Sequence, residues 1–344
     1  MSLTAAKTTL PLFVAVNSGC NMTCWYCTEH GESRDTVRGS IEQAELLRLI
    51  RCAYEAGFRT FRFTGGEPTL RRDLGEIMEA TQRLGDDVRI AMTTNGTRIE
   101  RVLPVIKQLI EPRIFLSIDG VHENPAIGLF RIEKILTDRI AAIVDEVAGA
   151  IPLRFNFVLT RGNLPQLWEI IDFASTRGVD VKIFELLLRN YFYAGDRERL
   201  AVFEEQYVPV RSIIPELQAR YGPARSFPGL GGRGIPMSYV DTGAIKIAYF
   251  DSLNGSHYHD ACRQCPLFPC QEGLYSAVLS SGGTIHPAGC ENMSFHFPVV
   301  HQSDELILSR LATLRKVIED GHFTAEIPAY LEKFKAGPEE AVPT

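Results

Sequence analysis

The 344-residue chain is 45% hydrophobic and 23% charged, with a formal net charge of −6, which indicates one large α/β domain or two unequal domains. Its acidic balance creates no cationic field for a phosphate backbone, so nucleic acids and anionic membrane surfaces are poor candidate partners. The N-terminus lacks the pattern of a signal peptide and no apolar run reaches the ~18 residues of a membrane helix, so a cytoplasmic protein is expected.

Short apolar stretches alternate with helical patterns through the first half of the chain. The stretches predict strands at Phe13–Val16, Phe61–Phe63, Val88–Met92, Ile114–Ile118, Leu153–Leu159 and Val181–Leu187. The periodicity between them predicts helices at Ile41–Ala56, Leu74–Leu84, Ile99–Ile110, Ile132–Ala148 and Leu164–Thr176. Such alternation is typical of parallel strands joined by right-handed crossovers. Six strands are too few for an eight-stranded barrel, so an α/β fold with a partial (β/α)6 TIM-like barrel is expected, with ligands at the C-terminal strand ends.

The pattern changes after Phe203. A helix is predicted to about Tyr221, followed by a loop rich in Gly and Pro up to Pro236. Hairpin strands are then predicted at Tyr239–Val240, Ile245–Phe250, Tyr275–Leu279 and Thr284–Ile285, and an amphipathic helix over Asp304–Lys335. The expected domains are a barrel at 10–222, a small C-terminal β-hairpin domain at 223–300 and a helical tail at 301–344.

Three cysteines lie on one loop directly after the first strand: Cys20, Cys24 and Cys27. Three thiolates within eight residues can hold three irons of a [4Fe–4S] cube and leave the fourth iron open to a small molecule. A structural zinc site with His30 as a fourth ligand is the alternative. Cys52 stands alone in a helical pattern, where a small core residue is expected.

A second cysteine group lies more than 230 residues further along the chain, and comprises Cys262, Cys265, Cys270 and Cys290. In a chain without a secretion signal, such spacing favours metal sites over a disulfide framework. A Cys-x-x-Cys pair with two further cysteines across a hairpin suits four-thiolate ligation. Structural zinc and an auxiliary [4Fe–4S] cluster fit that ligand set equally well.

The first cysteine loop, with an aromatic residue before its last cysteine, resembles the signature of radical S-adenosylmethionine (SAM) enzymes. Thr64-Gly65-Gly66-Glu67-Pro68 ends the second predicted strand and is similar to the Gly-Gly-Glu-Pro segment of that family. The match spans about Phe13 to Leu188. The resemblance implies that S-adenosylmethionine chelates the open iron and is cleaved to a 5′-deoxyadenosyl radical, which abstracts hydrogen from a substrate.

The same resemblance assigns the binding residues. It implies that Cys20, Cys24 and Cys27 bind the cluster and that Tyr26 meets the adenine of S-adenosylmethionine. It places Gly65, Gly66 and Glu67 at the amino group of the cofactor, since glycine lets a strand end approach a ligand closely. It further implies cofactor contacts at the ends of later strands, at Thr94, Ser117, Asn156 and Leu187.

The second cysteine group resembles the twitch type of auxiliary domain, a shortened relative of the SPASM extension, which implies an auxiliary [4Fe–4S] cluster. The layout is similar to that of the GTP cyclases of molybdenum-cofactor biosynthesis. Three departures argue against GTP cyclisation: Gly273–Leu279 contains no Arg, the chain does not end in Gly-Gly, and Phe13 stands in place of an Arg. Arg62, Thr93 and Arg154 match remaining substrate contacts of those cyclases, which favours binding of an anionic group.

The expected function is a radical SAM oxidoreductase or lyase acting on a sugar, a nucleoside or an amino-acid derivative. The auxiliary cluster is expected to aid oxidation or to bind substrate, and an electron donor such as flavodoxin or ferredoxin is the expected protein partner. Only about twelve residues precede the first predicted strand, which favours a small molecule over a peptide. The alternatives are a ribosomal-peptide-modifying radical SAM maturase and a non-enzymatic zinc-binding module.

Overall fold

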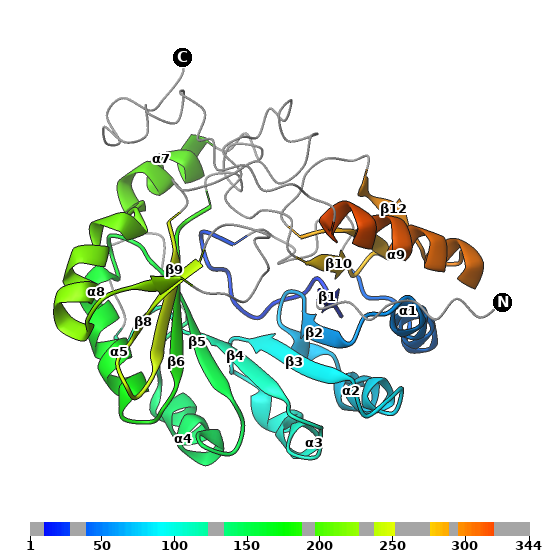
Figure 1. Cartoon of the computed structure of the whole chain (residues 1–344), viewed down its shortest axis with the longest axis horizontal. Coiled ribbons are helices and arrows are strands. Elements are labelled where there is room, and N and C mark those ends of the chain that lie inside the picture. Colours follow the sequence, from blue (N-terminus) through cyan, green and yellow to red (C-terminus); the bar gives the residue numbers. More distant parts are fainter. Residues whose placement is uncertain are drawn as a thin grey trace.

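The computed structural model describes residues 10–27, 39–122, 134–187, 197–226, 237–251, 276–288 and 295–319. Six parallel strands, adjacent in chain order, form the centre of one curved sheet (Figure 1). They are β1 (Pro11–Ala15), β2 (Thr60–Thr64), β3 (Arg89–Thr94), β4 (Arg113–Ser117), β5 (Leu153–Val158) and β6 (Asp180–Phe184). All six predicted strands are therefore present, and the arrangement is that of a partial TIM-like barrel.

Helices connect these strands and lie along the outer side of the curved sheet. They are α1 (Gln43–Glu55), α2 (Leu74–Gln82), α3 (Leu103–Ile106), α4 (Asp138–Val147) and α5 (Leu167–Ser175), with short 3₁₀ helices η1 (Pro68–Leu70), η2 (Ile99–Arg101) and η4 (Leu164–Gln166). Helix α1 begins where the Glu42 carboxylate accepts bonds from the backbone N–H groups of Ala44 and Glu45. Such side-chain caps replace the hydrogen bonds that the first turn of a helix lacks.

The predicted helix at Ile99–Ile110 is wrong in its extent. The structure divides this segment into η2 and the four-residue α3. Pro104 explains the division, because its ring cannot follow a helical turn without a steric clash and it has no backbone N–H to donate. Proline is tolerated only in the first turn, and Pro104 lies in the first turn of α3.

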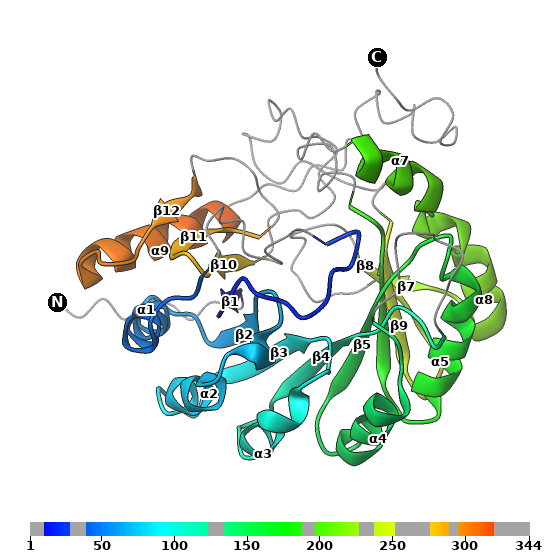
Figure 2. The ribbon, with the colours of Figure 1, turned by 180° about the vertical axis from the view of Figure 1, so that it is seen from behind.

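The sheet continues beyond both edges of the six parallel strands (Figure 2). Strand β9 (Lys246–Phe250) lies parallel to β6, and β10 (Ala277–Leu279) lies parallel to β1. Antiparallel partners follow outwards: β8 (Met237–Asp241), β7 (Arg225–Ser226), β11 (Thr284–Pro287) and β12 (Phe297–Pro298). The predicted hairpin strands therefore extend the barrel sheet, while a separate domain at 223–300 stays a prediction. Cys262, Cys265, Cys270 and Cys290 lie outside the described residues.

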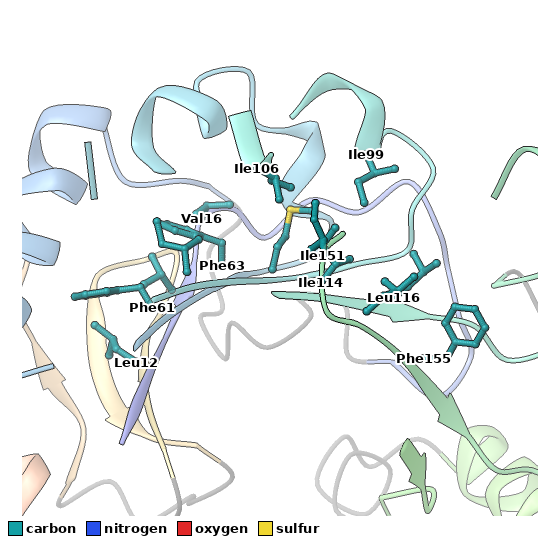
Figure 3. Close-up of a cluster of buried hydrophobic side chains, with 14 of the residues drawn as sticks. Leu12, Val16, Phe61, Phe63, Ile99, Ile106, Ile114, Leu116, Ile151 and Phe155 are labelled. Atoms are coloured by element: carbon teal, nitrogen blue, oxygen red, sulfur yellow. The ribbon is translucent and has the colours of Figure 1, made fainter. Parts of the chain in front are cut away.

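The two faces of the sheet differ in chemistry because side chains alternate along a strand. On the outer face, Phe61, Phe63 and Ile114 are buried and lie on the side of the sheet that the helices cover (Figure 3). Arg62 and Phe115 occupy the alternate positions and face the concave interior. The outer face therefore forms the hydrophobic core, and the concave face is available for a ligand.

Helices after β6 complete the described structure. These are α7 (Arg197–Gln206), η5 (Val210–Ser212), α8 (Ile214–Tyr221) and α9 (Asp304–Glu319). Helix α9 packs against α1 and β11, and the Asp304 carboxylate at its start accepts bonds from Arg48 and Arg51 on α1. Within the described ranges, no helix is long and apolar enough to cross a membrane.

Candidate functional site

The cysteine loop follows β1 at the C-terminal end of the parallel strands. Trp25, next to Cys24, is buried with Leu186 at the end of β6 and Phe203 on α7. A turn in which the Cys27 N–H donates to the Cys24 carbonyl oxygen (2.9 Å) brings these two cysteines together. Cys24 is buried, whereas Cys20 and Cys27 are exposed. Packing of Trp25 thus anchors a loop in which Cys20 and Cys27 stay accessible.

The end of β2 is bonded tightly to the same loop. The Gly66 N–H donates to the Asn17 carbonyl oxygen (3.1 Å), and the Glu67 N–H donates to the Gly19 carbonyl oxygen (2.9 Å). A Cβ atom at Gly66 would lie 2.3 Å from that Gly19 oxygen, and Gly65 has a φ of +138°. Both glycines are therefore needed to pack the strand end against the loop that leads to Cys20. Their contact with the cofactor stays a prediction.

Gly66→Ala is expected to displace the cysteine loop. The clash is with backbone atoms, which no change of rotamer relieves, so we expect a cost of about 1–3 kcal/mol in the free energy of unfolding and reduced iron binding after anaerobic reconstitution. Gly19→Ala is the matched control, because a Cβ at Gly19 meets nothing within 4 Å. Denaturant unfolding and iron analysis of both variants provide the measurement. Equal behaviour of the two variants would contradict the packing role of Gly66.

The Glu67 carboxylate links the ends of β2 and β3. It is 1% exposed, and its Oε1 accepts bonds from the Thr94 hydroxyl (2.7 Å) and from Thr69, while its Oε2 accepts from the Asn95 N–H (2.7 Å). Both oxygens of the carboxylate therefore have partners within the protein. Through these bonds, Glu67 and Thr94 hold the ends of β2 and β3 together. The predicted contacts of these two residues with the cofactor are not tested by this arrangement.

Asn95 connects β3 to the cysteine loop, and the sequence analysis did not single it out. Its amide nitrogen donates to Asn21 Oδ1 (3.0 Å) and lies 3.9 Å from Cys20 Sγ. Its oxygen accepts from the backbone N–H and the hydroxyl of Thr97, and Thr97 in turn accepts a bond from Asn21. The sequence signal for Asn95 was its place in the Thr-Thr-Asn-Gly segment that follows a predicted strand, where a polar side chain can reach a site at the strand ends.

The remaining predicted cofactor residues lie at neighbouring strand ends. Ser117 on β4 and Asn156 on β5 are direct partners in the register of the sheet. Leu187 follows β6, next to the Leu186 that packs against Trp25. Tyr26 lies in the cysteine loop, and its hydroxyl donates to Asp119 after β4. The structure thus gathers Tyr26, Ser117, Asn156 and Leu187 at one end of the sheet.

The concave face carries cations stacked on aromatic rings. The guanidinium carbons of Arg62 and Arg154 lie 4.4 and 4.1 Å from the ring centroid of Phe115. Arg62 also lies 4.7 Å from the centroid of Phe13, and its Nε donates to the Thr93 hydroxyl (2.6 Å). The three predicted substrate residues, Arg62, Thr93 and Arg154, therefore face the same interior.

Lys182 on β6 adds a third basic side chain that the sequence analysis missed. Its ammonium lies 4.3 Å from the Phe184 ring centroid and 5.3 Å from that of Phe250. Burial, with the repulsive charges of Arg154 and Arg62, holds the pKa of Lys182 well below its usual range. The signal in the sequence was a lysine that stands between the apolar residues Val181 and Ile183 of a predicted strand. An anion bound among these three cations would favour the charged form of Lys182.

The three thiols fit a [4Fe–4S] cluster in number, type and placement. They are soft donors from one loop at the ligand-binding end of the sheet. Among the described residues, no three His, Cys, Asp or Glu side chains converge to hold a single metal ion. A cube needs no such convergence, because each thiolate binds a different iron. His30 and the four later cysteines lie outside the described residues, so both the zinc alternative and the auxiliary site stay predictions.

The fold and the position of this loop agree with comparisons to known proteins. Residues 14–174 match the family model described as the radical SAM superfamily. The probable GTP 3′,8-cyclase of Methanothermobacter marburgensis is 31% identical over 212 residues, which cover 61% of this chain and 67% of that protein. The chain therefore belongs to the radical SAM superfamily, whose members use a [4Fe–4S] cluster and S-adenosylmethionine.

Other relatives carry the same name. The probable GTP 3′,8-cyclase of Sulfurisphaera tokodaii is 31% identical over 208 residues, 60% of this chain and 63% of that protein. The chain therefore spans less than two thirds of the length of this relative. Two solved structures share the fold, with TM-scores of 0.51: Streptococcus suis SuiB bound to S-adenosylmethionine (16% identity, 87% of this chain, 63% of that chain) and anSMEcpe with bound AdoMet (17% identity, 90% and 83%).

Proposed function

We propose that the chain is a radical SAM oxidoreductase or lyase that abstracts hydrogen from an anionic small molecule on the concave face of the barrel. The observation that carries the proposal is the convergence of Arg62, Arg154 and Lys182 on that face. Charge-assisted hydrogen bonds from such cations to a phosphate or carboxylate are stronger than neutral ones. They lie on β2, β5 and β6 of the sheet in which β1 leads into the cysteine loop.

In this proposal Cys20, Cys24 and Cys27 hold the cluster. When bound, the cluster supplies the electron that cleaves S-adenosylmethionine to the 5′-deoxyadenosyl radical, which removes a hydrogen atom from the substrate. The glycines of the β2 end shape the loop that holds the cluster. An auxiliary [4Fe–4S] cluster at Cys262, Cys265, Cys270 and Cys290 is part of the proposal, in a role of substrate oxidation or substrate binding.

Residues of the chain itself are proposed to position S-adenosylmethionine, the second cofactor. Tyr26 is proposed to meet the adenine, with Ser117, Asn156 and Leu187 around the rest of the nucleoside and Gly66 near the amino group. Ser117 and Asn156 are cross-strand partners on β4 and β5, so their polar groups can act on one ligand. The Asn156 oxygen also accepts a bond from Arg154 (3.2 Å). Arg154 thus joins the proposed cofactor side of the site to the proposed substrate side.

The relatives named GTP 3′,8-cyclase make a nucleoside triphosphate one candidate for the anionic substrate. Phe13 favours a different substrate, because it places an aromatic ring where the resemblance to those cyclases implies an Arg. The Phe13 ring stacks with the Arg62 guanidinium and adds no charge of its own. We therefore propose an anion with less charge than a triphosphate, such as a phosphorylated or carboxylated sugar, nucleoside or amino-acid derivative.

Production of 5′-deoxyadenosine tests this function. Protein reconstituted anaerobically and reduced with dithionite, or with flavodoxin or ferredoxin, is expected to form 5′-deoxyadenosine and methionine from S-adenosylmethionine. Anionic metabolites and GTP are then compared with their dephosphorylated forms, and stimulation by the anionic forms is expected. No cleavage by an iron-loaded protein would contradict the enzymatic proposal. Stimulation by a leader-bearing peptide instead would favour a peptide maturase.

A further inference from the structure

Tyr26, Asp119 and Lys134 form a buried polar cluster against the cysteine loop. The proposed function assigns no role to the charges of this cluster. The Tyr26 hydroxyl donates to Asp119 Oδ2 and accepts a bond from Lys134 Nζ (3.0 Å). Lys134 Nζ also lies 3.8 Å from Asp119 Oδ2 and 4.9 Å from the Tyr26 ring centroid. Tyr26 directly precedes Cys27, so the group contacts the cysteine loop next to its last thiol.

The backbone holds this group rigidly. Asp119 Oδ1 accepts from the Val158 N–H at the end of β5 (2.9 Å), and the Asp119 N–H donates to the Lys134 carbonyl oxygen (2.7 Å). The Asp119 carbonyl oxygen accepts from the Asn163 side chain (2.9 Å). The Asp119 and Lys134 side chains are 2% and 16% exposed. The ammonium therefore has a fixed place beside the loop, largely shielded from water.

Stability alone does not explain this ion pair. Desolvation of two buried charges offsets much of their attraction, and apolar replacements of such pairs are often neutral or stabilising. The pair does have an electrostatic effect on the loop. Although burial opposes the charged form, Asp119 raises the pKa of Lys134, and the ammonium contacts Tyr26, which directly precedes Cys27.

We propose that Lys134, oriented by Asp119 and Tyr26, is a positioning residue that raises the reduction potential of the cluster at Cys20, Cys24 and Cys27. The inference rests on the proposed function for those cysteines. A cluster gains one negative charge on reduction, and a nearby fixed cation stabilises the more negative form. Net charge, hydrogen bonding and solvent exposure are the properties through which a protein sets such potentials. Lys134 thus makes the proposed cluster easier to reduce.

The test is an anaerobic redox titration of the reconstituted full chain, followed by electron paramagnetic resonance without S-adenosylmethionine. Lys134→Met is expected to lower the midpoint potential, with up to tenfold less reduced relative to oxidised cluster at a fixed applied potential, or about 59 mV for one electron. Lys134→Arg keeps the charge and is expected to titrate close to the wild type. Lys107→Met, which removes an exposed lysine paired with Glu146, is the control and is expected to leave the potential unchanged.

Lys134→Met leaves Asp119 buried without its cation, so the double variant Lys134→Met/Asp119→Asn guards against loss of the fold. It is expected to bind iron and to keep a lowered potential, because it still lacks the cation that contacts Tyr26 beside the loop. An unchanged potential in iron-loaded Lys134→Met or in the double variant would overturn the inference. An equal shift in Lys134→Arg would overturn it too. A wild-type chain that binds no iron would instead refute the proposed function.

Discussion

Replacing Cys20, Cys24 and Cys27 together by Ala is expected to remove about four irons per chain after anaerobic reconstitution, with the matching acid-labile sulfide. Three thiolates from one loop hold three corners of the proposed cube, so no ligand from the protein remains in the triple variant. Cleavage of S-adenosylmethionine is expected to fall to background at the same time. Iron and sulfide analysis, with absorption spectra, provides the measurement.

The amount of iron that remains in the triple variant reports on the second cysteine group. About eight irons in the wild type and about four in the variant would support an auxiliary cluster at Cys262, Cys265, Cys270 and Cys290. About four falling to none would leave that group as zinc or free thiols. Cys52→Ala is the control, since Cys52 is buried in α1. Zinc at both groups without iron would refute the proposed radical chemistry.

Lys182→Met is expected to weaken binding of the anionic substrate by about 10- to 100-fold, the usual loss for one charge-assisted hydrogen bond to a buried ligand. The Met side chain keeps the contacts with the rings of Phe184 and Phe250 but carries no charge. Isothermal titration of iron-loaded protein with the anionic metabolite identified in the 5′-deoxyadenosine assay measures the effect. Lys246→Met on the adjacent strand β9 is the matched control, because Lys246 lies at an exposed position.

Proton uptake provides a second readout at Lys182. Its pKa in the folded protein lies below the 10.5 of an ordinary lysine, chiefly because of burial, and a bound anion is expected to raise it. Binding therefore takes up a proton in the pH range between the pKa of the free protein and that of the complex. Titration in buffers of different ionisation enthalpy detects this uptake, which Lys182→Met should abolish. Equal uptake in wild type and variant would contradict the role of Lys182.

The same pKa predicts how stability depends on pH in the free protein. Between the lowered pKa of folded Lys182 and 10.5, the unfolded chain binds a proton that the folded chain does not. The free energy of unfolding therefore rises with pH through this range. Lys182→Met is expected to reduce that rise, as measured by denaturant unfolding at several pH values.

The sequence by itself determined the parallel-strand fold and the cysteine loop. The alternation of short apolar stretches with helical periods predicted all six parallel strands, because local periodicity reflects which side chains must be buried. The loop was recognised from the spacing of Cys20, Cys24 and Cys27, which no distant contact alters. Where a local rule was overlooked the prediction was wrong: Pro104 divides the helix predicted at Ile99–Ile110.

Only the tertiary structure decided which side chains from different strands meet. Arg62, Arg154 and Lys182 are far apart in the sequence, and strand register together with sheet curvature brings them to one face. Glu67 lies in a segment whose pattern predicts a ligand contact, yet its carboxylate accepts bonds from Thr94 and Asn95 at the end of the next strand. Lys134 lies in no motif, and its ammonium contacts Tyr26 in the cysteine loop. Local sequence determines periodicity and spacing, whereas convergence depends on long-range packing, which no single segment contains.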